Sequence, residues 1–343
     1  MMITQEELKS EWGSLTKYTV DNGDGYAFSC VNYGAALTSL TMPDSSGYSS
    51  NILLQFARPD SMYNDQTYFF GKAIGRVGGR IKDGSYRLNG HPYQLPQNEG
   101  TNTLHGGANG FHHLWWHAKT IHNGIEFTRE ITREDDGFPG ILKTSITYRW
   151  GENHQFHIEF NGFNDSDEAT LFNPTVHSYF NLNNDKTRGL VCHELNMHAN
   201  RVAELGNDLI PTGKLFAVDG TPFDFRQSQT LDKMIESVKK DGFTGYDHPF
   251  QVSGPLIATL KNTENRRRVD LYSDRNACIL YTLNAIGKPE SVNGGADLKP
   301  FMAAALEPQT LPDAVHHPDF GNIILQPHQE QSYHIVYALA VDA

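Results

Sequence analysis

Cysteine is scarce in this chain of 343 residues. Only Cys30, Cys192 and Cys278 are present, an odd number with wide spacing. Such a set forms neither the paired pattern of a structural metal site nor a disulfide framework. Because disulfide frameworks belong to oxidising compartments, this sequence favours a reducing one, and we interpret the protein as cytoplasmic.

Basic runs and long apolar runs are also missing. The formal net charge is −12, and the only basic triplet spans residues 266–268, whereas nucleic-acid binders usually carry a basic face. No stretch approaches the roughly 20 apolar residues that span a bilayer, and the charged start MMITQEELKSEWG does not resemble a signal peptide. We therefore expect no nucleic acid and no membrane as partner. The sequence leaves both a monomer and a homodimer open.

Familiar signatures of nucleotide binding and of serine hydrolysis are absent. There is no G-x-G-x-x-G opening a helix, no G-x-x-x-x-G-K and no G-x-S-x-G. The 16 histidines raise the question of a metal site. The best-spaced pair, His113 and His117, lies among tryptophans without an acidic partner, so packing explains it better. We expect no metal and no cofactor.

What the chain does contain is alternation of apolar and polar residues. This pattern covers residues 142–150, 156–160 and 333–341 and predicts half-buried antiparallel strands. Asn89-Gly90 predicts a type I′ turn in a hairpin over residues 85–95. Apolar residues at helical spacing predict one clear helix within residues 228–242, and we expect a shorter helix at 58–64.

Many strands and few short helices predict an all-β fold, a large antiparallel sandwich or barrel. The sequence has no Pro-, Gly- or Ser-rich linker, no low-complexity block and no internal repeat. All-β domains can exceed the ordinary domain size. We therefore expect a single β domain over residues 1–343.

The stretch NPTVHSYFNL, residues 173–182, is the first candidate for chemistry. Read as one strand, it has a mostly apolar face and an opposite face that is entirely hydrogen-bonding. The polar face carries Asn173, Thr175, His177, Tyr179 and Asn181. The pattern places His177 at the centre of this face, and leaves open whether the face meets water or lines a site.

Two glycine-rich stretches each carry one candidate side chain. GGRIKDG places Arg80 directly after two glycines, and TLHGG places His105 before two more. Glycine lets another group approach the backbone closely, and the arginine fork suits hydroxyls or carboxylates. A structural ion pair for Arg80 and a surface position for His105 remain the alternatives.

Two acidic residues complete the set. GYDHPF sets Asp247 two residues before a proline, with an Asx-type turn as the alternative, and AAALEPQ contains Glu307. Ala303 and Ala305 share a strand face with Glu307, and we interpret their small side chains as leaving room beside it; a solvent-facing glutamate is the alternative. Two histidines, an aspartate, a glutamate and an arginine suit proton transfer on a polyhydroxylated molecule.

The five stretches GGRIKDG, QNEGTNTLHGG, NPTVHSYFNL, GYDHPF and LEPQ, in this order, resemble the galactose mutarotase or aldose 1-epimerase family. The resemblance runs from about Trp12 to Val341. It implies a β-supersandwich, an isomerase of carbohydrate metabolism that interconverts the α and β anomers of an aldose such as galactose or glucose, and a small-molecule sugar as the partner.

The resemblance also implies roles for individual residues. Glu307 corresponds to the general base and His177 to the general acid, and we expect opposite charges on this pair. His105 corresponds to a sugar-binding residue that also assists the acid–base chemistry. The other residues expected to bind the sugar are Arg80, Gly79, Asp247 and Tyr179.

Two departures from the family pattern bear on the preferred sugar. Many relatives carry asparagine where this chain has Gly79, and many carry a glutamine just ahead of the segment that here reads YTLN, residues 281–284. Both positions would contact sugar hydroxyls. A hexose-6-phosphate epimerase, a glycoside hydrolase using Asp247 and Glu307, and a non-catalytic carbohydrate-binding protein remain alternatives, and reducing disaccharides such as maltose or lactose remain open as substrates.

Overall fold

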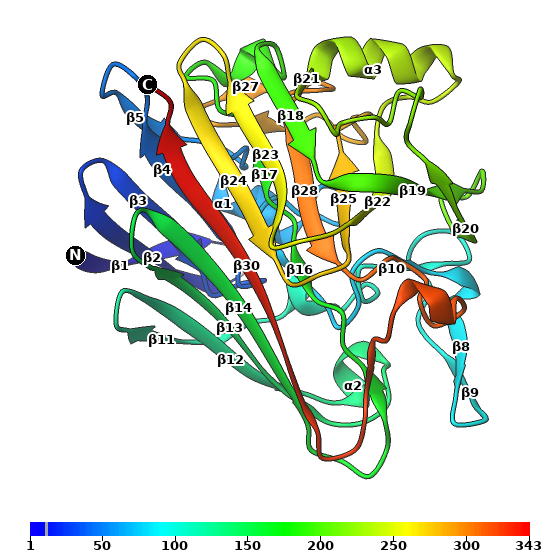
Figure 1. Cartoon of the computed structure of the whole chain (residues 1–343). Coiled ribbons are helices and arrows are strands. Elements are labelled where there is room, and N and C mark those ends of the chain that lie inside the picture. The colour runs from blue at the N-terminus through cyan, green and yellow to red at the C-terminus, as the bar shows by residue number, and fades with distance from the viewer. Residues whose placement is uncertain (11–12) are drawn as a thin grey trace.

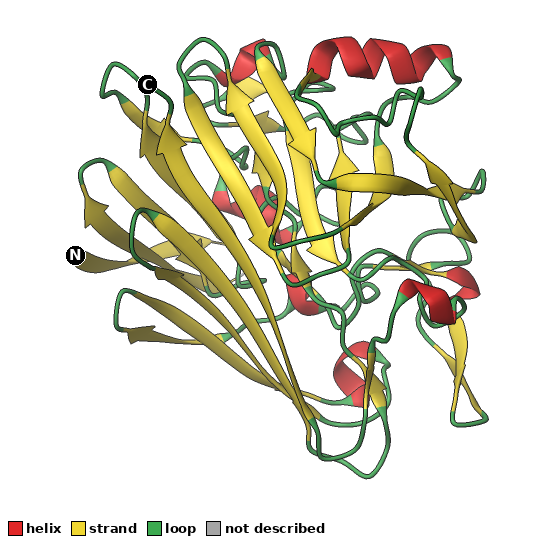
Figure 2. Ribbon diagram, in the orientation of Figure 1, coloured by secondary structure: helices red, strands yellow, loops and turns green. Residues whose placement is uncertain are grey.

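The computed structural model describes residues 1–10 and 13–343, so Trp12, where the resemblance was expected to begin, lies outside the described residues. Antiparallel sheets dominate the molecule, and helices are few and short (Figures 1 and 2). The predicted all-β sandwich is confirmed. None of the helices in the described part of the chain is both long and apolar enough to cross a membrane.

The largest sheet has nine strands and is antiparallel throughout. It contains the three predicted strands, because their apolar residues alternate onto one face that the core covers. In spatial order its strands are β11 (His117–Ile121), β12 (Gly124–Ile131), β13 (Leu142–Trp150), β14 (Gln155–Asn164), β30 (Glu330–Val341), β24 (Arg267–Ser273), β23 (Leu256–Asn262), β18 (His193–Met197) and β21 (Gln229–Thr230).

Two further sheets pack against the nine-stranded one. The five-stranded sheet contains β1 (Met2–Ser10), β2 (Gly13–Gly23), β3 (Tyr26–Val31), β4 (Leu37–Pro43) and β5 (Ser49–Asn51). The six-stranded sheet contains, in spatial order, β17 (Tyr179–Phe180), β28 (Ala304–Gln309), β25 (Ala277–Tyr281), β22 (Asp247–Val252), β19 (Ala199–Leu205) and β20 (Pro211–Ala217).

Aromatic contacts join these layers into one buried cluster. Phe28 of β3 lies 4.9 Å from Phe156 of β14, and Phe180 of β17 lies 5.1 Å from Tyr337 of β30, between ring centroids. All four side chains are at most 1% exposed. Burying a side chain of this size stabilises the fold by about 1.5–3 kcal/mol, so the sheets are held together chiefly by their apolar faces.

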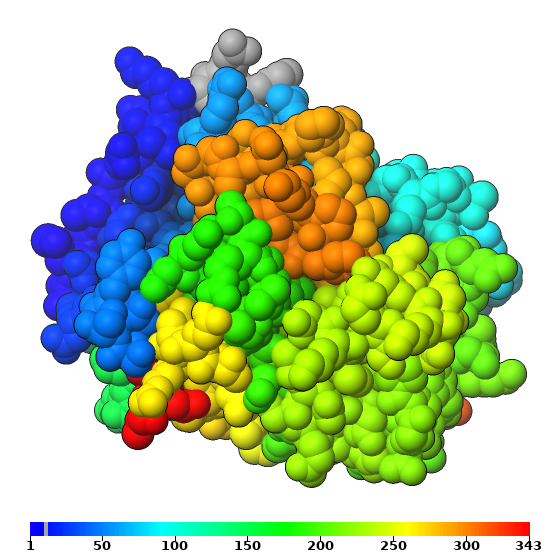
Figure 3. Space-filling model, turned by 90° about the horizontal axis from the view of Figure 1, so that it is seen from above, coloured from blue at the N-terminus to red at the C-terminus, as the bar shows by residue number. Residues whose placement is uncertain are grey.

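Shorter elements complete the fold. The predicted hairpin is confirmed as β8 (Ser85–Leu88) and β9 (His91–Gln94). The two predicted helices are confirmed as α1 (Pro59–Tyr63) and α3 (Leu231–Lys240). Seen from above, the segment that contains α3 and the segment near residue 300 form neighbouring parts of the surface (Figure 3). The shorter strand pairs are β6 (Ala73–Ile74) with β16 (Thr175–Val176), β7 (Arg80–Ile81) with β10 (Thr103–Leu104), β8 (Ser85–Leu88) with β9 (His91–Gln94), β15 (Thr170–Leu171) with β29 (Ile324–Leu325), and β26 (Ser291–Val292) with β27 (Ala296–Asp297). The helices are α1 (Pro59–Tyr63), α2 (Arg133–Asp136) and α3 (Leu231–Lys240).

The stretch at residues 173–182, which alternation reads as one strand, is divided in the structure. It forms two short strands, β16 and β17, which pair with different partners, β6 and β28. The switch of partner falls at His177 and Ser178, and every residue of the stretch is buried on both faces. Of the two possibilities left open for the polar face, the structure favours a site, because His177 and Tyr179 of this face line a cleft.

Alternation along the six-stranded sheet separates core from cleft. On β28, Leu306 lies in the hydrophobic core and Glu307 lines the cleft on the opposite face. On β25, Leu280 lies in the core and Ile279 lines the cleft. Because successive side chains of a strand point to opposite faces, one face of this sheet seals the sandwich. The other face forms the floor of an open cleft.

Candidate active site

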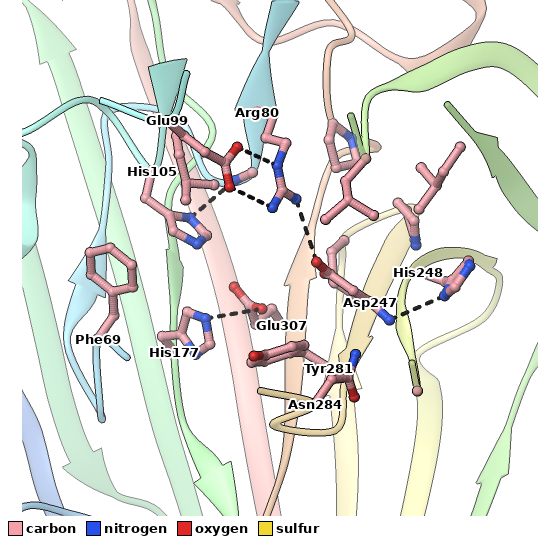
Figure 4. A pocket seen from close by; sticks show the side chains of 18 of the residues that line it. Phe69, Arg80, Glu99, His105, His177, Asp247, His248, Tyr281, Asn284 and Glu307 are labelled. Carbon is pink, nitrogen blue, oxygen red and sulfur yellow. Dashed lines mark hydrogen bonds and ion pairs between the residues drawn. The ribbon is translucent and has the colours of Figure 1, made fainter. Parts of the chain in front are cut away.

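A cleft of about 320 Å³ lies over the floor formed by β28, β25 and β22 (Figure 4). Its volume falls in the range of about 300–1,000 Å³ usual for small-molecule sites. The cleft brings together residues as far apart in the sequence as Gly79 and Glu307. Every residue that the sequence analysis assigned to the site lines it: Gly79, Arg80, His105, His177, Tyr179, Asp247 and Glu307.

Glu307 and His177 face each other at the cleft floor. Glu307 Oε1 lies 3.5 Å from His177 Nε2, and the two side chains are only 3% and 5% exposed. His177 is fixed through its backbone, because its N–H donates to Lys72 O and its carbonyl accepts from Gly71 N–H, at 3.0 and 2.9 Å. Glu307 is fixed on β28, opposite Ile279 of β25.

Burial opposes the opposite charges that the resemblance implies for this pair. Burial raises the pKa of Glu307 to about 8, with nearby Asp247 acting in the same direction and Arg80 opposing. Burial also lowers the pKa of His177 to about 3. The loss of hydration disfavours both charged forms, so near neutrality these shifts favour a single proton in the pair, on the carboxyl group of Glu307.

One oxygen of Glu307 has no partner among the described residues. Its Oε2 is buried and makes no hydrogen bond, and neither polar atom of the Gln309 side chain makes one. Both residues line the cleft. Buried polar atoms are rarely left unpaired in native proteins, so this floor is suited to a ligand rich in hydroxyl groups.

His105 is buried rather than exposed at the surface. Its Nδ1 accepts a hydrogen bond from the backbone N–H of Gly79 at 3.2 Å. The ring proton therefore resides on Nε2, which makes His105 a neutral donor at that atom. Gly106 follows in the left-handed region, with φ of +83°, where a Cβ atom would lie 2.0 Å from Gly75 O. The glycine after His105 is thus required for this tight approach.

Arg80 joins two carboxylates at the cleft wall. Its Nε and Nη2 donate to Glu99 at 2.6 and 2.8 Å, while its Nη1 lies 3.6 Å from Asp247 Oδ2. The structural ion pair considered for Arg80 is therefore present, with Glu99, in a residue that also lines the cleft. Asp247 begins strand β22 rather than an Asx-type turn, and its carboxylate is held by Arg80.

Aromatic rings support His177 on its flanks. The Tyr179 ring is stacked on the imidazole at 4.7 Å, and the Phe69 ring is nearly parallel to it at 6.1 Å. Tyr179 is only 1% exposed. Its contact with His177 indicates that it holds the imidazole in place as much as it lines the cleft.

The interpretation of the small alanines was wrong. Ala303 and Ala305 are fully buried in a second hydrophobic cluster that includes Tyr179 and Phe70. Protein side chains therefore fill the space beside them. The room around Glu307 comes from the cleft above β28, where Ile279 and Gln309 are its neighbours.

Several lining residues escaped the sequence analysis: Phe69, Glu99, Ile279, Tyr281 and Gln309. Strand alternation already places Gln309 on the same face as Glu307, two residues further along, but it gave Gln309 no role in the site. Of the two residues directly ahead of the segment YTLN, Ile279 lines the cleft, whereas Leu280 is buried in the core. The cleft floor beside Glu307 is therefore apolar at Ile279.

Three potential metal ligands cluster at the floor. One ligand atom from each of His105, His177 and Glu307 lies within 4.8 Å of the others. Two imidazoles and a carboxylate are a donor set that zinc accepts. The same three groups also suffice for proton transfer without a metal.

Comparisons with known proteins agree with this geometry. The family model described as aldose 1-epimerase matches residues 16–338. The chain is 36% identical to an aldose 1-epimerase of Streptococcus thermophilus, covering 95% of each chain. It is 34% identical to the maltose epimerase of Levilactobacillus brevis, covering 97% of this chain and 98% of the relative. It is 30% identical to the human galactose mutarotase, covering 95% and 94%.

Solved structures share the fold over the full length. The GalM/aldose epimerase homologue of C. elegans superposes with a TM-score of 0.88 at 25% identity, covering 99% of this chain and all of the other. The galactose 1-epimerase of Lactobacillus acidophilus superposes with a TM-score of 0.85 at 24% identity, covering 100% and 99%. The chain therefore belongs to the aldose 1-epimerase family and is an isomerase with a galactose mutarotase-like β-sandwich fold.

Proposed function

We propose that this enzyme interconverts the α and β anomers of a free aldose such as galactose or glucose, with Glu307 as general base and His177 as general acid. One observation carries the proposal: Glu307 Oε1 and His177 Nε2 lie 3.5 Å apart on a buried cleft floor. Two groups at this separation can serve the C1 hydroxyl and the ring oxygen of one pyranose, which are bonded to the same carbon.

The reaction requires two proton transfers for ring opening. Glu307 removes the proton of the C1 hydroxyl, His177 protonates the ring oxygen, and the C1–O5 bond breaks to give the open aldehyde. After rotation about C1–C2, the chain closes on the other face of the carbonyl with both transfers reversed. Ring opening starts from carboxylate and imidazolium, and ring closure starts from carboxyl and imidazole. These two states hold the same single proton, so the neutral carboxyl and imidazole that burial favours are one of the two working forms of the pair.

The remaining groups would hold the sugar in place. Arg80 and Asp247 offer a donor and an acceptor at the cleft wall, His105 offers a donor, and Gln309 offers both. Holding the reacting atoms in line with the acid and base contributes to the rate by removing unproductive orientations.

Two variants test the assignment of roles. Glu307→Gln and His177→Asn should each reduce mutarotation of fresh α-D-glucose or α-D-galactose, followed by polarimetry, by about 10²–10⁴-fold, the usual contribution of a positioned acid or base. The exposed residues Glu330 and His91 provide matched controls as Glu330→Gln and His91→Asn. A variant of either site residue that keeps activity within tenfold of the parent would remove that residue from its role.

The cleft itself disfavours two alternatives. Arg80 is the only cation among the lining residues, and Glu99 already binds it at two points, which leaves little for the phosphate of a hexose 6-phosphate. Asp247 is held by Arg80, which disfavours it as a hydrolytic partner of Glu307. Incubation with oligosaccharides distinguishes hydrolysis, because new reducing ends would appear. Binding without faster mutarotation would indicate a carbohydrate-binding protein.

We also propose a cytoplasmic location, which is supported by the free state of Cys30, Cys192 and Cys278. Cell fractionation followed by detection of the protein would test this location.

A further inference from the structure

The cleft extends beyond the residues proposed to carry out the reaction. Across the six-stranded sheet, Glu307 lies on β28, Asp247 lies on β22 two strands away, and Leu205 lies on β19 one strand further. Neighbouring strands are about 4.8 Å apart, so Glu307 and Asp247 are separated by about 10 Å across the sheet. One pyranose with its hydroxyls spans this distance. The cleft therefore extends beyond one pyranose, over β19 and the turn that follows this strand.

The far end of the cleft is apolar and open to solvent. Leu209, in the turn between β19 and β20, is 37% exposed, and Phe243 is 39% exposed. Both line the cleft, together with Leu205, Thr244 and Gly245, and no side chain of these five is charged. Seven large hydrophobic side chains are exposed in the described part of the chain, and two of them, Leu209 and Phe243, line this cleft. Apolar side chains beside a polar cleft mark a recognition surface.

The Phe243 ring is held in a fixed orientation. It packs edge-on against Phe223 at 5.8 Å and against His248 at 4.9 Å, with interplanar angles of 84° and 81°. Neighbouring rings thus support it while more than a third of its surface remains free. A rigid, exposed aromatic ring can bind a flat partner at low entropic cost.

We propose that Leu205, Leu209 and Phe243 form an outer subsite for the second sugar ring of a neutral reducing disaccharide. The inference rests on the proposed function, because it places the reducing sugar over Glu307 and His177. A ring attached to that sugar away from C1 leaves the C1 hydroxyl and ring oxygen free to react. The second ring then extends past Asp247 and lays its C–H face on Phe243. The absence of charge at this end favours a neutral sugar over a phosphorylated or acidic one.

The test compares two pairs of sugars in the wild-type enzyme and in Phe243→Ala. Mutarotation of maltose and lactose, and of glucose and galactose, is followed by polarimetry to obtain kcat/KM. We expect Phe243→Ala to lower kcat/KM for the disaccharides about tenfold, the size of a lost aromatic contact, and to leave the monosaccharides within twofold. Phe243→Tyr should retain the wild-type preference. Val191→Ala, another exposed apolar residue that lies outside the cleft, should change neither.

Three outcomes would overturn the subsite. The first is that Phe243→Ala lowers kcat/KM equally for disaccharides and monosaccharides. The second is that it lowers kcat/KM for neither. The third is a wild-type enzyme that acts on monosaccharides but not on disaccharides. A wild-type enzyme that accelerates mutarotation of no sugar at all would instead overturn the proposed function. Leu209→Ala provides a second variant if Phe243→Ala folds poorly, and it should show the same selective loss.

Discussion

The side chain of Asn173 binds the backbone of Thr310 at two points. Its Nδ2 donates to Thr310 O at 3.2 Å, and its Oδ1 accepts from Thr310 N–H at 2.9 Å. Asn173 lies four residues before His177, and Thr310 lies three residues after Glu307. Arg275 is buried beside them and donates to Asn173 Oδ1 and to Thr310 Oγ1. This connection therefore fixes the segment of the proposed acid relative to the segment of the proposed base.

Replacing Asn173 should misplace the pair without removing it. We expect Asn173→Ala to lower kcat by about 10–100-fold, because small errors in the position of reacting groups have effects of this size, and to change KM much less. Steady-state polarimetry gives both constants. Asn322→Ala, at an exposed asparagine, serves as the control. A variant that loses thermal stability but keeps its kcat would show that the connection is only structural.

The protonation of the pair predicts a loss of activity at high pH. The pair holds one proton while Glu307, with its pKa near 8, remains protonated and His177, with its pKa near 3, remains neutral. Above about pH 8 that proton is lost, and none remains for the ring oxygen. We expect kcat/KM to be flat between pH 5 and 7, to be about half its maximum near pH 8, and to fall about tenfold per pH unit beyond that. A profile that keeps rising above pH 9 would contradict the assignment.

The same burial predicts how stability depends on pH. The pKa of Glu307 is raised in the folded protein from an ordinary value of 4.5 to about 8. Its contribution is therefore fully present below pH 4.5 and is lost as pH rises through 8, because the buried carboxyl group must then ionise. Glu307→Gln removes this loss. The free energy of unfolding of the wild type relative to Glu307→Gln should fall between pH 4.5 and 8 by up to roughly 5 kcal/mol, at about 1.36 kcal/mol per pH unit, as measured by urea denaturation.

Gly79 and Pro312 form a packed pair at the cleft wall. Gly79 has φ of +71°, and a Cβ atom there would lie 2.9 Å from Cβ of Pro312. Introducing the asparagine of many relatives at this position should therefore be unfavourable here. We expect Gly79→Asn to lower stability by about 1–3 kcal/mol through overpacking, and Pro312→Gly in the same chain, which removes the Cβ of residue 312, to recover part of the loss. Thermal unfolding of both single variants and of the double variant measures this coupling, and strictly additive effects would show that it does not exist.

The cluster of His105, His177 and Glu307 invites a test of metal dependence. We expect mutarotation to continue at its full rate after exhaustive treatment with EDTA, because the proposed mechanism transfers only protons. Polarimetry before and after treatment, with metal analysis of the protein, measures this directly. Loss of activity that added zinc restores would assign a bound metal to the reaction instead.

The sequence predicted most of the architecture and fell short where distant segments meet. Long strands such as β13 and β14 and the helix α3 follow from periodicity alone. The switch of partner at His177 does not, because β6 and β28 come from remote parts of the chain. Depth of burial shifts the pKa values of Glu307 and His177 toward their neutral forms, and no local sequence pattern reports depth. The single-domain prediction stays a prediction; the largest buried cluster includes residues as distant as Tyr18 and Leu339, and one cooperative calorimetric transition would support it.

Glu307 and His177 are almost entirely enclosed by protein, and this has a consequence for the solvent. Each turnover returns the proton that it borrowed, so the pair needs no supply from dissolved acids or bases. Free sugars in water, in contrast, change anomer faster when buffer is added, because buffer ions then act as the acid and base. The enzymatic rate, corrected for that background, should therefore be independent of buffer concentration. The enclosed floor separates the anomeric equilibrium of the sugar from the chemical composition of the surrounding medium.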